Sequence, residues 1–101
     1  MPIIYVRESD FDSIVNSNDV VILDFYANWC GPCRMLGEVL EEISYEHPEL
    51  VVGKINVDDE RSLANKFSIR SIPQLYIYKK GELFESITGY ISKEDLLEVI
   101  K

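Results

Sequence analysis

Residues 20–33 read VVILDFYANWCGPC, and the rest of the architecture can be arranged around them. The first part, residues 20–27, is almost continuously apolar and begins with β-branched residues, a pattern typical of a strand covered on both faces of a sheet. The last four residues carry a Cys-x-x-Cys pair, Cys30 and Cys33, where the strand pattern gives way to a helical one. We therefore predict a strand in the middle of a sheet, followed at once by two cysteines.

The segments around this stretch alternate between strand and helix patterns. Strand patterns occupy four further segments, residues 3–6, 50–57, 74–78 and 83–87. Helical patterns occupy four segments: residues 33–46, residues 59–67, the segment after Ser9 or Asp10, and the segment after Ser92. We expect Ser9 or Asp10 to cap the first helix and Ser92 to cap the last. Helices between the first strands require parallel pairing, and the turn at 79–82 makes a hairpin of the last two. The order βαβαβαββα predicts an α/β fold with a mixed sheet, a parallel core and an antiparallel edge.

The longest helical pattern, residues 33–46, is amphipathic. Glutamates line one side of it, and His47-Pro48 ends it, because the residue before a proline disfavours helical geometry. The apolar side, which we expect to face the core, consists of Met35, Leu36, Val39, Leu40 and Ile43.

Composition narrows the class of protein. The 101 residues include 10 Lys and Arg against 18 Asp and Glu, for a formal net charge of -8. This balance argues against nucleic acid and anionic membranes as partners, because both require clustered cations. The sequence also lacks a secretory signal pattern and the ~20 apolar residues of a membrane span. We predict one domain, residues 1–101, that is soluble and cytoplasmic.

The cysteine pair has the position and spacing of a redox site. At the start of a helix, Cys30 would face unpaired backbone N–H groups and the positive end of the helix dipole, which stabilise a thiolate and lower its pKa. Cys33 lies about one helical turn further on, close enough to attack the sulfur of Cys30 and expel a bound thiol. Pro32 suits a first helical turn because its missing N–H has no partner there. Gly31 leaves room for a partner chain.

Two other uses of the pair stay open at this point. A structural zinc ion needs four ligands, whereas the only histidine, His47, is distant in sequence, so no metal is expected. Two thiols that only pack in the core are the second alternative, since buried free cysteine is common.

Several segments resemble the thioredoxin family. Residues 24–34, DFYANWCGPCR, are similar to its active-site strand and loop, residues 54–58 to its third strand, and residues 71–73 to the loop that faces its disulfide; residues 79–82 and Gly89 extend the match. The resemblance implies a thioredoxin-like fold and a general protein dithiol-disulfide oxidoreductase without a cofactor. It further implies a monomer that receives electrons from a thioredoxin reductase and passes them to disulfide-containing client proteins. A non-catalytic binding or assembly subunit with the same fold is the alternative.

The resemblance also assigns catalytic roles, with Cys30 attacking and Cys33 resolving the mixed disulfide. Asp24 lies inside an apolar strand, so burial should raise its pKa, and the resemblance makes it the base for Cys33, through a water. Lys54 resembles the lysine beside this acid. The alternatives are that Asp24 caps the next helix and that Lys54 is an ordinary exposed strand residue.

A second group of residues is expected to bind clients. Trp29 is either a flat docking surface or part of the core. Pro73 begins a strand, where a trans proline is the ordinary case, but the resemblance implies a cis bond beside the disulfide. The backbone of Ile72 would then pair with an extended client segment. The predicted client-binding residues are Trp29, Gly31, Pro32, Ile72, Pro73 and Gly89.

Three residues depart from the family pattern. Glu38 stands where a helix-kinking proline is usual, Ser71 where glycine is common, and Gln74 where threonine is usual. Ser71 and Gln74 flank the loop at 72–73, so they bear on client preference rather than on the sulfur chemistry. Tyr26 replaces a frequent tryptophan conservatively.

Overall fold

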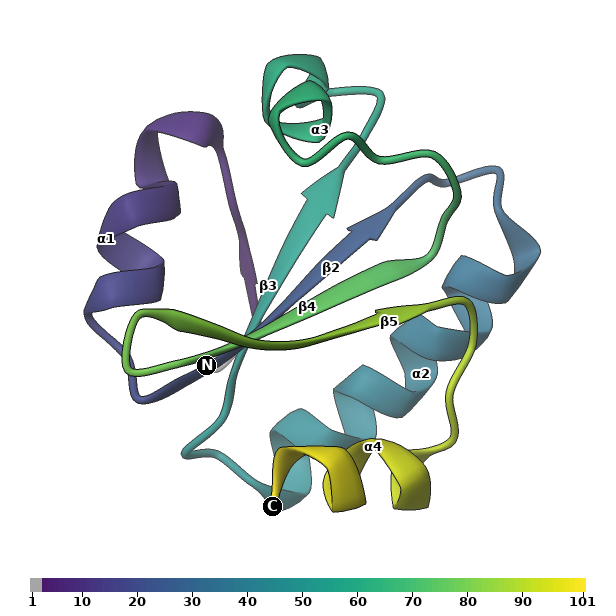
Figure 1. The fold of residues 1–101 in the computed structure, drawn as a ribbon. Helices are drawn as coiled ribbons and strands as arrows, with labels where there is room; N and C mark the ends of the chain where they lie inside the picture. Colours follow the sequence, from purple (N-terminus) through teal and green to yellow (C-terminus); the bar gives the residue numbers. More distant parts are fainter. Residues whose placement is uncertain (1–2) are drawn as a thin grey trace.

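A five-stranded sheet forms the centre of the computed structural model (Figure 1). The structure describes residues 3–101, so Met1 and Pro2, with which the predicted domain begins, lie outside the described part. From one edge to the other the strands are β1 (Ile3–Tyr5), β3 (Val51–Asn56), β2 (Val20–Tyr26), β4 (Gln74–Lys79) and β5 (Glu82–Thr88). The strand that the sequence places in the middle is therefore the central one.

Strand direction follows the connections. β2 pairs in parallel with β3, and β3 pairs in parallel with β1. The helices α1 and α2 provide the crossovers from β1 to β2 and from β2 to β3 that parallel strands need. β4 is antiparallel to β2, and β5, reached through a tight turn, is antiparallel to β4. The predicted α/β fold, with a parallel core and an antiparallel hairpin at its edge, is confirmed.

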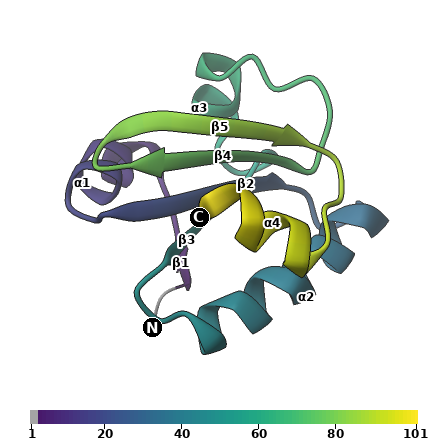
Figure 2. The same ribbon diagram turned by 60° about the horizontal axis from the view of Figure 1, so that its bottom comes forward.

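Four α-helices within residues 3–101 cover the sheet: α1 (Phe11–Asn16), α2 (Gly31–Glu46), α3 (Arg61–Lys66) and α4 (Lys93–Ile100). The two views show α2 and α4 on one face and α1 and α3 on the other (Figures 1 and 2). In this part of the chain, none of the helices combines the length and hydrophobicity that crossing a membrane demands.

The alternation of side chains along β2 explains why this strand is buried on both faces. Ile22 packs in a core with Leu36 and Leu40 of α2, whereas Leu23 and Phe25 belong to the core beneath α1 and α3. Since neighbouring residues of a strand point to opposite faces, Asp24 lies on the same face as Ile22, under α2. The fold thus brings one carboxyl group to the helix that carries Cys33.

Gly53 allows β3 to lie close to its neighbours. A Cβ atom on this residue would lie 2.9 Å from Cδ2 of Leu23 and 2.9 Å from Cγ2 of Val6, closer than carbon atoms pack. Only glycine therefore fits this position without displacing the side chains around it.

The two predicted helix caps have different outcomes. The cap at Ser92 is confirmed, because its Oγ accepts a 3.2 Å hydrogen bond from the Asp95 N–H. The cap at Ser9 or Asp10 is right in position only: Asp10 is the N-cap residue of α1, but its side chain makes no capping hydrogen bond. A 3-10 turn, Glu8–Asp10, runs directly into α1 and leaves Asp10 with helical dihedral angles. Its carboxylate instead accepts a 3.1 Å hydrogen bond from Arg7 Nε.

Candidate active site

The cysteine pair lies at the junction of β2 and α2. Cys30 is the N-cap residue of α2, and its Sγ accepts a 3.2 Å hydrogen bond from the Cys33 N–H. Pro32 occupies the first helical turn, as predicted. The two cysteines form a disulfide with their Cα atoms 5.2 Å apart. This bond overturns the alternative of two thiols that only pack.

A small apolar cluster surrounds the disulfide. Cys30, Cys33 and Ala27 are buried, and Tyr26 and Ile72 pack against them. Such a site excludes water from the sulfurs on most sides, so a client must approach through the remaining opening. Gly31 borders open space, because a Cβ atom there would meet nothing within 4 Å.

The loop before β4 and the residue after β5 lie together beside the disulfide. The carbonyl oxygen of Ile72 is 3.9 Å from Cys30 Sγ. The Ile72–Pro73 peptide bond is cis, as the resemblance implied. The Gly89 N–H donates a 2.8 Å hydrogen bond to the Pro73 carbonyl. Gly89 adopts φ +90, which favours glycine, and the space around it is open.

Trp29 lies at the surface next to the disulfide, not in the core. Its side chain is 70% exposed, and its indole Nε1 donates a 3.0 Å hydrogen bond to Oδ2 of Asp58. The sequence did not single out Asp58, although it ends the segment 54–58, because no spacing pattern links positions 29 and 58. Met35 is 57% exposed, so its predicted place on the inward face of the helix is wrong. It lies off the side of α2 that faces the sheet, which the buried residues Cys33, Leu36, Leu40 and Ile43 define.

Asp24 and Lys54 form a buried ion pair on neighbouring strands. They are direct partners in the β2–β3 register, and Nζ of Lys54 lies 2.9 Å from Oδ2 of Asp24. Asp24 is fully buried and the Lys54 side chain is 13% exposed, so an ordinary exposed lysine is ruled out. The helix-cap alternative for Asp24 also fails, because Cys30 caps α2. Burial raises the pKa of Asp24, and the nearby Lys54 ammonium offsets this only in part.

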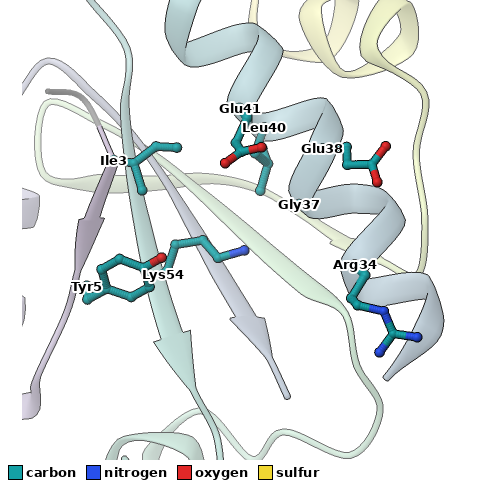
Figure 3. A pocket seen from close by; sticks show the side chains of 8 residues that line it. All are labelled: Ile3, Tyr5, Arg34, Gly37, Glu38, Leu40, Glu41 and Lys54. Carbon is teal, nitrogen blue, oxygen red and sulfur yellow. The ribbon is translucent and has the colours of Figure 1, made fainter. Parts of the chain in front are cut away.

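Lys54, but not Asp24, borders open cavities, two of which adjoin α2. The larger, about 310 Å³, opens between α2 and the strands β1 and β3, and Lys54 extends across it toward Gly37 (Figure 3). The smaller, about 220 Å³, is bordered by Cys33, Arg34, Gly37 and Lys54. The Lys54 ammonium also lies 4.4 Å from the ring centroid of Tyr26. The lysine thus connects the buried carboxylate with a space that reaches the second cysteine.

Comparisons with known proteins agree with this geometry. A family model described as Thioredoxin matches residues 2–101. A thioredoxin of Staphylococcus epidermidis is 42% identical over 101 residues, covering 99% of this chain and 96% of its own. A thioredoxin of Mycoplasmoides gallisepticum is 34% identical over 95 residues, covering 94% and 95%. A solved structure of a mutant thioredoxin from Halobacterium salinarum superposes with a TM-score of 0.89 at 37% identity, covering 97% of this chain and 87% of its own.

The chemical class follows from the arrangement of the two sulfurs. A Cys-x-x-Cys disulfide at the N-cap of a helix, placed after the central strand of this sheet, is the site of a protein dithiol-disulfide oxidoreductase. The matches over nearly the full length show that the chain belongs to the thioredoxin family. The sheet with its flanking helices is accordingly the thioredoxin-like fold. A non-catalytic binding or assembly subunit does not require paired sulfurs at this position, and nothing found in the site favours this alternative.

Proposed function

We propose that the protein is a general reductant of protein disulfides, in which Cys30 attacks the client and Cys33 releases it. The position of Cys30 as the N-cap of α2 carries this assignment, because free backbone N–H groups and the helix dipole stabilise a thiolate there. Cys33, one turn into the helix, is the less exposed of the two, at 2% against 6%. The client therefore meets Cys30 first.

The two steps transfer two electrons to the client. The Cys30 thiolate attacks one sulfur of the client disulfide, forming a mixed disulfide while the other client sulfur leaves as a thiolate. The Cys33 thiolate then attacks Sγ of Cys30. This step forms the Cys30–Cys33 disulfide and releases the second client thiolate, so the client is reduced and the protein is oxidised.

In this scheme Asp24 accepts the proton of Cys33, and Lys54 orients the carboxyl group of Asp24. A carboxyl group whose pKa burial raises accepts a proton more readily than an exposed carboxylate does. The cavity between Lys54 and Cys33 has room for a water that carries the proton between Cys33 and the acid. Lys54, bonded to Oδ2, orients the carboxyl group and leaves Oδ1 free for this exchange.

Clients bind across the residues that surround Cys30. The backbone of the half-buried Ile72, beside Pro73, offers hydrogen bonds to an extended client segment, as an added strand would receive them. Trp29 supplies an exposed aromatic surface. Gly31 and Gly89 leave the backbone open to close approach, and Pro32 is exposed between the two cysteines. This mode recognises an extended disulfide-bearing segment rather than one particular sequence, which suits a general reductant.

Regeneration requires an external electron donor, because the chain holds only these two cysteines. A thioredoxin reductase fits the family and would reduce the Cys30–Cys33 disulfide in the cytoplasm, where the protein acts as a monomer. The insulin precipitation assay tests the function: with dithiothreitol or NADPH and thioredoxin reductase, the protein should accelerate insulin reduction. Protein with both thiols alkylated is the control. If the unmodified protein gives no more precipitation than this control, the proposed function is wrong.

A further inference from the structure

Gln74 is a buried amide at the start of β4, directly after Pro73. Its Nε2 donates hydrogen bonds to two carbonyl oxygens, those of Leu75 at 3.2 Å and of Ile87 at 3.1 Å. Its Oε1 accepts a 2.7 Å hydrogen bond from the Thr88 hydroxyl. One side chain therefore engages both strands of the terminal hairpin.

These bonds lie at the end of the hairpin that faces the disulfide. Gln74 and Thr88 are paired in the β4–β5 register. The residue before Gln74 is Pro73 and the residue after Thr88 is Gly89, and the Gly89 N–H donates to the Pro73 carbonyl at 2.8 Å. The side-chain bonds thus continue the backbone ladder toward Pro73 and Gly89, and the residue before Pro73, Ile72, has its carbonyl oxygen 3.9 Å from Cys30 Sγ.

An edge strand needs such support at its end. β5 is the edge of the sheet and most of its residues are exposed, so its terminal backbone hydrogen bonds can open at little cost. A threonine at position 74 would offer a single hydroxyl on Cβ. It could not supply two N–H donors and a carbonyl acceptor together.

We propose that Gln74 and Thr88 are positioning residues that fix the separation of Pro73 and Gly89 and so determine affinity for protein clients. This inference rests on the proposed binding of clients at Ile72, Pro73 and Gly89. With this separation already fixed, binding of a client segment does not have to supply the free energy of ordering the loop. The sulfur chemistry depends on α2 and does not involve the hairpin amide.

The test compares a protein client with a small disulfide. Thr88→Val and Gln74→Met each remove hydrogen-bonding groups at similar volume. Thr88→Val removes one hydrogen bond and should raise KM for insulin about fivefold, whereas Gln74→Met removes three and should raise KM at least as much. The kcat for insulin and the rate with 5,5′-dithiobis(2-nitrobenzoic acid), which needs no extended binding surface, should stay at wild-type values. Thr88→Ser keeps the hydroxyl and should restore KM. Ser86→Val, an exposed change on the same strand, is the matched control.

The outcomes separate the inference from the function on which it rests. The double variant Thr88→Val with Gln74→Met should raise KM no more than Gln74→Met alone, since both changes break one network. An active wild type whose KM is unaffected by these variants would overturn the inference and leave the function intact. An equal loss with the small disulfide would also overturn it, because the pair would then support the cysteines rather than the client surface. Wild-type protein that fails to reduce insulin would contradict the proposed function itself.

Discussion

Oδ2 of Asp24 lies 2.9 Å from the ammonium of Lys54, whereas Oδ1 of the same carboxyl group has no hydrogen-bond partner within residues 3–101. A buried oxygen without a partner costs free energy, and a core of this kind would be more stable with an uncharged side chain. The carboxylate is therefore a thermodynamic cost, on the face of the sheet that α2 covers, and the proposed mechanism uses it to accept the proton of Cys33.

Asp24→Asn should stabilise the protein in a pH-dependent way. Because burial raises the folded-state pKa of Asp24 above its unfolded value, stability due to its proton is present below the unfolded pKa. That stability is lost as the pH rises through the folded pKa. Asparagine does not titrate, so its advantage should be absent at low pH and grow as the pH rises through the folded pKa of Asp24.

Denaturant melts of wild type and Asp24→Asn between pH 4 and 8 measure this effect. The same variant should slow release of the mixed disulfide, because Cys33 loses its proton acceptor. Asp19→Asn, an exposed change just before the same strand, is a control for charge alone. A variant that is less stable than wild type at pH 7, or that reacts equally fast, would contradict the assigned role.

Lys54→Met should shift the pH dependence of the reaction. The ammonium lowers the pKa of Asp24, opposing the larger effect of burial, so its removal should raise that pKa further. The rate of the second step should then rise with pH at higher values than in wild type. Single-turnover kinetics across pH give the profile, with Lys66→Met on α3 as the control. An unshifted profile would mean that Lys54 does not act on Asp24.

The two cysteine variants should fail in different ways. Cys30→Ser should leave insulin reduction at the level of buffer, because no nucleophile remains at the helix start. Cys33→Ser should still attack the client and then accumulate as a mixed disulfide, which non-reducing electrophoresis detects. Faster alkylation of Cys33 than of Cys30 at neutral pH, or normal turnover by Cys33→Ser, would reverse the assignment.

Two glycine-to-alanine changes should have opposite effects on stability. Gly53→Ala places a methyl group 2.9 Å from Leu23 and Val6, so it should destabilise the protein by about 1–3 kcal/mol. Gly37 lies within α2, and an added methyl group there would be 3.5 Å from Nζ of Lys54, an ordinary contact. Gly37→Ala should therefore stabilise the protein by about 0.5–1 kcal/mol through helix propensity. Urea melts compare the two, and equal effects would refute the packing described around β3.

Much of the fold could be predicted because its signals are local. The apolar run at 20–27, the turn at 79–82 and the capping pattern at Ser92 each specify geometry within a few residues. The cysteine pair could be placed for the same reason, since its chemistry depends on a strand followed immediately by a helix. Asp24 was recognisable because a lone carboxyl group interrupts an apolar strand.

The remaining features depend on contacts between distant segments. Whether the Asp10 side chain caps α1 depended on how the preceding turn joins that helix. The exposure of Met35 depended on which side of α2 turns toward the sheet. The bond from Trp29 to Asp58 spans 29 residues, and the Gln74 to Thr88 network spans the hairpin. No periodicity in the sequence reports such pairs, so only the assembled fold reveals them.

In the proposed function the Cys30–Cys33 pair carries two electrons to a client disulfide, and a single stoichiometric reaction tests this transfer. Fully reduced protein is mixed with insulin without any other reductant, and free thiols are alkylated and counted by mass spectrometry. We predict that each protein molecule loses both of its thiols, forms the Cys30–Cys33 disulfide and yields two new thiols on insulin. Protein that keeps both thiols while insulin stays intact, or that ends with one cysteine permanently bound to insulin, would contradict the two-electron transfer.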